Sequence, residues 1–144
     1  MRTLFIFLFV IVIIPLSIFG IPLDTSFQTT SNTLKQYHIS INDVGLSALG
    51  FECQLRNGET VSRLINPGDE SVIDLHVDDN DAMFVPCNFY WSRHDRNIHV
   101  YDKSLKKQCG DALVNTCKWK ISSDGFYVYD ISQNPPNFVK MYGW

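Results

Sequence analysis

Short alternations of apolar and polar residues, each closed by turn residues, run through most of the chain and limit the folds that it can adopt. Residues 37–41 and 51–55 carry apolar side chains at every second position, and Asn57-Gly58 then follows as a strong hairpin signal. Similar segments lie at 61–65, 72–77, 83–91, 98–101, 117–121, 126–131 and 138–142. About eight short strands with frequent turns predict an all-β fold, an antiparallel β-sandwich.

The same alternation predicts the core and the irregular segments. Pro86 lies inside 83–91 and lacks a backbone N–H, which indicates an edge strand or a bulge. Residues 102–116 have no clean period, so we expect a loop that Cys109 holds in place. Inward positions are expected for a set of apolar and cysteine side chains: Ile39, Ile41, Phe51, Cys53, Phe89, Trp91, Val100, Cys117, Trp119, Ile121 and Tyr127.

The first residues indicate export. Arg2 precedes an almost wholly apolar stretch over 4–18, which is the layout of a secretory signal peptide. The stretch is shorter than the roughly 20 residues of a membrane span, although a retained signal anchor is the alternative. We expect cleavage after Gly20, a flexible mature N-terminus over 21–35, and one β-sandwich domain over 36–144.

Four cysteines follow the leader: Cys53, Cys87, Cys109 and Cys117. An even number in a short exported chain predicts two disulfides, and three pairings are open. A zinc site is the alternative, but such sites usually contain closely spaced cysteine pairs. The shortest gap here, from Cys109 to Cys117, is eight positions, so disulfides are favoured.

Charge and motifs argue against several functions. The net charge is −3, so the chain lacks the excess of basic residues that binds a phosphate backbone, and we expect no nucleic-acid partner. His94 and His99 are five positions apart, hence on opposite faces of a strand, while His38 and His76 are isolated. Neither Gly-x-Ser-x-Gly nor His-Glu-x-x-His occurs. We expect no catalysis, no cofactor and no metal, and we interpret the acidic residues after position 77 as a solvated turn.

Several blocks, in their order, resemble the plant self-incompatibility protein S1 family, also called S-protein homologues. The blocks are 37–44, 49–53, 83–91, 98–102, Cys109, Cys117-Lys-Trp119 and Gly125-Phe-Tyr127. The resemblance implies a small secreted β-sandwich with four cysteines. It also implies a ligand role, because the founding members are secreted by the pistil and recognised by pollen through a membrane receptor. Residues 54–60 depart from the family, which usually has a Ser- and Asp-rich stretch there.

These observations together predict a secreted, extracellular, non-enzymatic ligand in plant cell–cell recognition or signalling. We expect a monomer that binds a plasma-membrane receptor protein and does not insert into the membrane after signal cleavage. The alternative is a secreted defence protein that binds carbohydrate or membrane through exposed aromatics such as Tyr90 or Trp144. Binding usually resides in loops, so the candidate receptor contacts are Asn57, Glu59, Asp78, Asp79, Asp81, Arg93, Asp95, Arg96, Lys103, Lys106 and Lys107.

Overall fold

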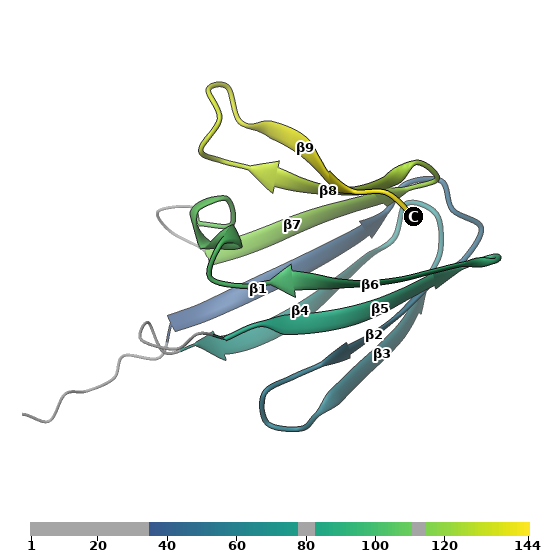
Figure 1. The fold of residues 1–144 in the computed structure, drawn as a ribbon, viewed down its shortest axis with the longest axis horizontal. Helices are drawn as coiled ribbons and strands as arrows, with labels where there is room; N and C mark the ends of the chain where they lie inside the picture. The colour runs from purple at the N-terminus through teal and green to yellow at the C-terminus, as the bar shows by residue number, and fades with distance from the viewer. Residues whose placement is uncertain (1–34, 78–82, 111–114) are drawn as a thin grey trace, which may run out of the picture. The chain divides into compact units, whose positions relative to one another are not determined.

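The computed structural model describes residues 35–77, 83–110 and 115–144, which form a β-sandwich (Figure 1). In chain order its elements are β1 (Lys35–Asp43), β2 (Leu49–Gln54), β3 (Thr60–Ile65), β4 (Glu70–Val77), β5 (Val85–Trp91), β6 (His94–Tyr101), the 3-10 turn η1 (Leu105–Lys107), β7 (Asn115–Ser122), β8 (Gly125–Asp130) and β9 (Asn137–Tyr142). The predicted all-β sandwich is confirmed. The predicted signal peptide over 1–20 lies outside the described residues and stays a prediction.

Two sheets make up the sandwich. One has the strand order β4-β1-β7-β8-β9 and the other has the order β3-β2-β5-β6. Every pairing within them is antiparallel except that of β1 with β7, where Ile39 lies opposite Cys117 in parallel register. Between β1 and β7 the chain passes through β2, β3, β4, β5 and β6. The two parallel partners are thus joined by a long connection, which a parallel pair requires.

The core lies between the two sheets and is rich in aromatic rings. Phe89 of one sheet contacts Phe126 of the other with ring centroids 5.2 Å apart. The indole Nε1 of Trp119 donates a 2.8 Å hydrogen bond to the backbone carbonyl of Val100, which joins β7 to β6 across the sandwich. A buried indole N–H usually needs such a partner. Trp119 therefore packs in the core as predicted and also links the sheets by a polar contact.

Two of the predicted core residues are only half-buried. Trp91 is the last residue of β5 and packs against the edge of the core. Tyr127 was assigned to the wrong face, because Phe126 and Val128 of β8 point inward and the alternation then turns Tyr127 outward. The other predicted core residues are fully or almost fully buried. The alternation thus predicted the core well in the middle of the strands and poorly near the turns.

Both disulfides form, and the structure gives their pairing. Cys53 and Cys87 are directly opposed on the neighbouring strands β2 and β5. Cys109, which follows η1, is bonded to Cys117 of β7 and holds the crossover segment in place as predicted. Neither bond joins a strand of one sheet to a strand of the other. The packed side chains and the Trp119–Val100 hydrogen bond therefore connect the layers.

Pro86 illustrates a bulge rather than an edge. The register between β5 and β6 shifts between Val85 and Pro86, and β5 lies inside its sheet between β2 and β6. The bulge accommodates a residue that cannot donate a hydrogen bond to the neighbouring strand.

Within the described ranges, no helix has the length and apolar character that crossing a bilayer would require.

Candidate functional site

The described candidate contact residues lie at two opposite ends of the sandwich (Figure 1). The turn between β2 and β3 carries Asn57 and Glu59, and it lies at the same end as Val85 and Tyr101, after which Lys103 follows. Arg93 lies at the other end, in the turn between β5 and β6. Strands of seven or eight residues separate the two ends by roughly 20 Å. The predicted set therefore does not form one continuous surface.

We call the first of these the lysine end, defined by residues 55–59 and 102–110, and the second the aromatic end, defined by Trp91, His94, Trp144 and the β7–β8 turn. The predicted contacts Asp78, Asp79 and Asp81 lie outside the described residues. Their assignment to a contact surface stays a prediction.

The β2–β3 turn holds its two candidate side chains in a defined geometry. The Asn57 side chain accepts a 2.9 Å hydrogen bond from the backbone N–H of Glu59 and donates one of 3.1 Å to the Glu59 carboxylate. Gly58 has a φ of 81°, which glycine adopts at little cost. The predicted Asn-Gly hairpin is thus confirmed, and it presents an amide and a carboxylate to solvent.

The segment after β6 fixes the positions of its lysines. The Asp102 carboxylate accepts hydrogen bonds from the backbone N–H of Ser104 at 2.7 Å and of Leu105 at 3.0 Å. Leu105 is buried, and the bond from Cys109 to Cys117 closes the segment. Lys103 and Lys107 are exposed and Lys106 is half-buried on this ordered backbone. A charged surface is therefore displayed by a short segment with buried anchors on both sides.

Two hollows open at the lysine end. One of about 500 Å³ lies between the β2–β3 turn and β4, and it is lined by polar and apolar residues: Leu55, Arg56, Asn57, Glu59, Asp74, Leu75, His76 and Met83. The other, of about 300 Å³, includes Lys103 and a ring pair in which Phe84 stacks on His99 at 5.1 Å. The candidate residues of this end thus border concave surface.

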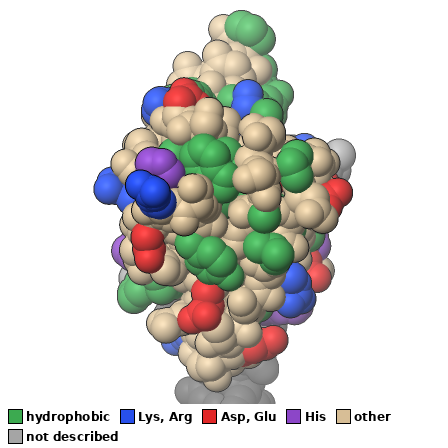
Figure 2. Space-filling model, turned by 90° about the vertical axis from the view of Figure 1, so that its right-hand side faces the viewer, with side chains coloured by type: hydrophobic (Ala, Val, Ile, Leu, Met, Phe, Trp, Pro, Cys, Tyr) green, Lys and Arg blue, Asp and Glu red, His purple; other side chains and the backbone are tan. Residues whose placement is uncertain are grey.

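Aromatic rings gather at the aromatic end. Trp91 stacks on His94 at 5.4 Å, and the Trp144 ring lies 5.8 Å from Trp91. Figure 2 looks onto this end and shows hydrophobic side chains in the middle of the face with charged side chains around them.

Asp95 and Arg96 were predicted in a loop, but they belong to strand β6. The tight turn at Ser92 and Arg93 lets this strand begin at His94. Both are nevertheless exposed.

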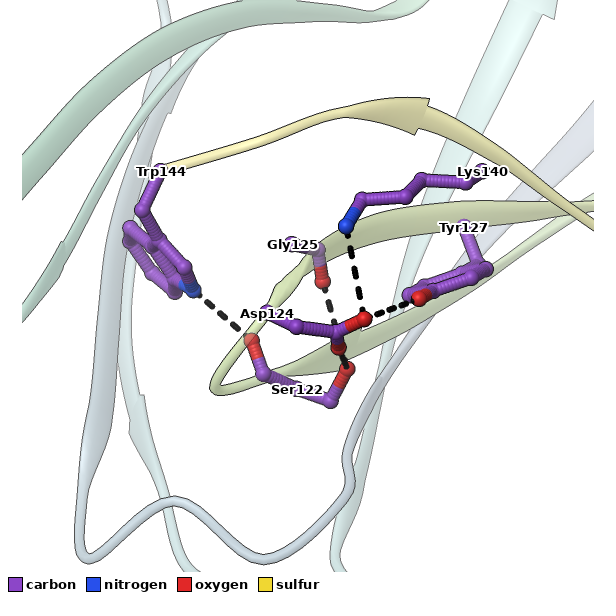
Figure 3. Close-up of polar contacts among 6 residues, drawn as sticks. All are labelled: Ser122, Asp124, Gly125, Tyr127, Lys140 and Trp144. Atoms are coloured by element: carbon purple, nitrogen blue, oxygen red, sulfur yellow. Dashed lines mark hydrogen bonds and ion pairs between the residues drawn. The ribbon is translucent and has the colours of Figure 1, made fainter.

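Asp124 organises the β7–β8 turn at the same end (Figure 3). Its carboxylate accepts a 2.6 Å hydrogen bond from the Ser122 hydroxyl, a second from the Tyr127 hydroxyl, and one of 3.3 Å from the Lys140 ammonium. These donors, Ser122 first, lower the pKa of Asp124 well below its usual range. The bond to Asp124 raises the pKa of Tyr127. The turn is thus a polar network suited to rigidity rather than to proton transfer at neutral pH.

The histidines of β1 and β6 each contact a residue of another type. His38 Nδ1 lies 2.5 Å from a carboxylate oxygen of Asp74, and His99 Nδ1 lies 3.9 Å from a carboxylate oxygen of Asp102. His94 stacks on Trp91 at the other end of β6. Among the residues that the structure describes, no group of three His, Cys, Asp or Glu side chains is arranged to hold a metal ion.

Two buried carboxylates accept hydrogen bonds from the segments that follow their strands. Asp43 accepts a 2.9 Å hydrogen bond from the N–H of Leu46, and burial raises the pKa of Asp43. Asp130 accepts hydrogen bonds from Ser132 and Gln133, which lower the pKa of Asp130. Each carboxylate shapes the connection that follows its strand. Neither lines one of the hollows described above.

Comparisons with known proteins agree with this architecture. The family model described as plant self-incompatibility protein S1 matches residues 38–144. A solved plant structure is similar to this chain with a TM-score of 0.54 and 19% identity, over 77% of this chain and 97% of that one. That structure represents self-incompatibility protein homologues, described as a widespread family of small, highly stable, secreted proteins from plants. Among curated proteins, none matches the chain significantly.

Proposed function

The chain belongs to the plant self-incompatibility protein S1 family, and on that basis we propose that it is a ligand that binds a receptor protein of the plasma membrane. The similar solved structure represents proteins described as small and secreted, and this protein acts outside the cell as well. Its role is recognition or signalling between cells rather than catalysis. His38 contacts Asp74, His94 stacks on Trp91 and His99 stacks on Phe84, and these separate partners support the non-enzymatic part of the proposal.

The lysine end is the receptor-contact surface. The observation that carries this assignment is the ordered display of Lys103, Lys106 and Lys107 on a segment held by Leu105 and by the bond from Cys109 to Cys117. A surface that is already ordered loses little conformational entropy when it binds. Basic side chains on such a surface can pair with an acidic patch on a receptor and fix the orientation of the complex.

The aromatic end is the less suitable contact surface. The rings of Trp91, His94 and Trp144 contact one another there. Trp144 also donates a hydrogen bond to Ser122. These internal contacts give the rings a structural role, and Arg93 and Arg96 stand on the margin of this cluster.

Charge reversal at each end tests the assignment. The double variant Lys103→Glu/Lys107→Glu should lower the affinity for receptor-bearing plant cells by at least about tenfold, because two favourable charge contacts become repulsive. Binding is measured with fluorescently labelled, oxidised protein on isolated plant plasma membranes. The matched control is Arg93→Glu/Arg96→Glu, which changes the net charge by the same amount at the opposite end.

The control variant should bind within about twofold of the wild type. Equal losses in both variants would show that net charge rather than the lysine end governs binding. A loss confined to Arg93→Glu/Arg96→Glu would transfer the contact surface to the aromatic end. Saturable binding to membranes whose surface proteins have been removed by protease would contradict a protein receptor.

A further inference from the structure

The outer face of the five-stranded sheet carries basic and aromatic side chains in two rows. In one row Lys120 lies opposite Tyr127, and Tyr127 lies opposite Lys140. In the next row Tyr129 lies opposite Phe138, and the Lys118 ammonium is 6.0 Å from the Tyr129 ring. We call this surface the lysine–aromatic face and define it by six residues on β7, β8 and β9: Lys118, Lys120, Tyr127, Tyr129, Phe138 and Lys140.

The lysines of this face lie over rings. The Lys120 ammonium is 5.6 Å from the Tyr127 ring and 5.7 Å from the Phe138 ring. The Lys140 ammonium is 5.7 Å from the Tyr127 ring and also contacts Asp124. Such cation–π contacts hold the long lysine side chains against the sheet and reduce their freedom. The face therefore presents positive charge and ring surface together in an ordered array.

A hollow of about 360 Å³ lies beside the rows, toward β1 and β4. Its polar lining includes Ser40, Asn42 and Glu70, together with Lys118, Lys120 and the ring of Phe138. The Ser40 hydroxyl donates a hydrogen bond to Glu70. Phe138 is 43% exposed although it is a large apolar side chain. The hollow thus combines hydroxyl, amide and carboxylate groups with an exposed ring at its border.

We propose that the lysine–aromatic face and its hollow bind an acidic polysaccharide of the uronic-acid type. The ammonium groups complement carboxylates along such a chain. The exposed ring of Phe138 offers a flat surface to the apolar face of a sugar ring. The polar groups in the hollow can exchange hydrogen bonds with sugar hydroxyls. The net charge of the protein is −3, so its overall charge does not attract a polyanion at long range. Binding therefore depends on the lysine side chains and aromatic rings that lie together on this face.

This surface differs from the receptor-contact surface proposed above. Its residues lie on the outside of one sheet, whereas Lys103, Lys106 and Lys107 lie in the β6–β7 crossover. The lysine–aromatic face also contains neither of the two aromatic residues that the sequence suggested for carbohydrate or membrane binding. Tyr90 lies across Gly50 on the other sheet, and Trp144 is half-buried.

Affinity electrophoresis in gels that contain polygalacturonate tests the proposal, with neutral dextran gels as the reference. The oxidised wild-type protein should be retarded by polygalacturonate and not by dextran. The variant Lys118→Gln/Lys120→Gln/Lys140→Gln should bind at least about tenfold more weakly, because three charge contacts are lost. The variant Phe138→Ala should weaken binding without any change in net charge.

The matched control is Lys103→Gln/Lys106→Gln/Lys107→Gln, which removes the same charge from the lysine end and should be retarded like the wild type. Equal weakening of both triple variants would overturn the proposal, and so would an unchanged affinity of Phe138→Ala. Equal or tighter wild-type binding to poly-glutamate or to phosphatidylserine vesicles would assign the face to another class of partner. Receptor binding on protein-bearing membranes should persist in Lys118→Gln/Lys120→Gln/Lys140→Gln, so the two proposals can fail separately.

Discussion

The indole Nε1 of Trp144 donates a 2.7 Å hydrogen bond to the backbone carbonyl of Ser122 (Figure 3). The same ring lies 4.6 Å from Phe126 and 5.8 Å from Trp91. Trp144 thus contacts strands of both sheets and covers the end of the core beside the β7–β8 turn. This one side chain combines apolar contact with a directional hydrogen bond.

Substitution of Trp144 should therefore destabilise the fold. We expect Trp144→Ala to lower the free energy of unfolding by about 2 kcal/mol, because a half-buried ring and a hydrogen bond are both lost. Trp144→Phe retains a ring and should cost about 1 kcal/mol. Urea unfolding of the oxidised proteins measures both values. Coincident transitions for Trp144→Ala and the wild type would refute this role for Trp144.

Two glycines with positive φ allow a matched comparison. Gly125 has a φ of 143°, and a Cβ placed there would meet the carbonyl oxygen of Tyr142 at 2.2 Å, whereas Gly58 has a φ of 81° and open space around it. Gly58→Ala should cost about 1 kcal/mol through backbone conformation alone. Gly125→Ala should cost more, because β9 must also shift. Thermal unfolding ranks the two variants, and equal midpoints would contradict the close approach of β9.

The network around Asp124 predicts a pH dependence of stability. The pKa of Asp124 is lowered in the folded protein, so its contribution is present above the unfolded pKa of about 3.9 and is lost as the pH falls toward the folded value. Asp124→Asn should therefore be less stable than the wild type at pH 7, and the gap should narrow below about pH 4. Denaturant midpoints of both proteins at pH 7, 5, 3 and 2 measure the gap. A gap that stays constant over this range would show that Asp124 acts without its charge.

The two disulfides should differ in what their removal affects. Cys53 and Cys87 are 34 positions apart, and Cys109 and Cys117 are 8 apart. Loop-closure entropy then predicts costs of about 3.8 kcal/mol for Cys53→Ala/Cys87→Ala and about 2.5 kcal/mol for Cys109→Ala/Cys117→Ala at 25 °C. Membrane binding should show the opposite order, because only the second variant releases the backbone that carries the lysines. A parallel loss of stability and binding in both variants would argue against the lysine end.

The middle of each strand was predictable from the sequence. Ile39, Phe51 and Phe89 alternate with polar neighbours, and the sandwich buries all three completely. Tyr127 shows where this reasoning fails. The strand that follows a turn can begin on either face, and here the tight turn after Ser122 pairs Ile121 with Phe126, so that Phe126 shares the inward face of Ile121. Such local backbone geometry leaves no periodic signal in the sequence.

Contacts between distant segments were harder to predict. The pairing of Cys109 with Cys117 depends on the crossover from one sheet to the other, and four cysteines alone leave three pairings. The lysine–aromatic face was missed, although Lys118 and Lys120 alternate with Cys117 and Trp119 and so had to point outward. The sequence signal for this face is the set of polar positions that alternate with the core residues. Only the register with β8 and β9 shows that rings stand beside these lysines.

The parallel pairing of β1 with β7 has a consequence for biosynthesis. Tyr37 and Asn115, which lie opposite each other, are 78 positions apart, so about 4–16 s of translation separate their emergence from the ribosome. During that interval the nascent β1 can pair with β4, but its other side has no neighbour. An open strand edge is a site for pairing with a second chain. The yield of correctly folded protein should therefore depend on chaperones that shield β1 until β7 arrives.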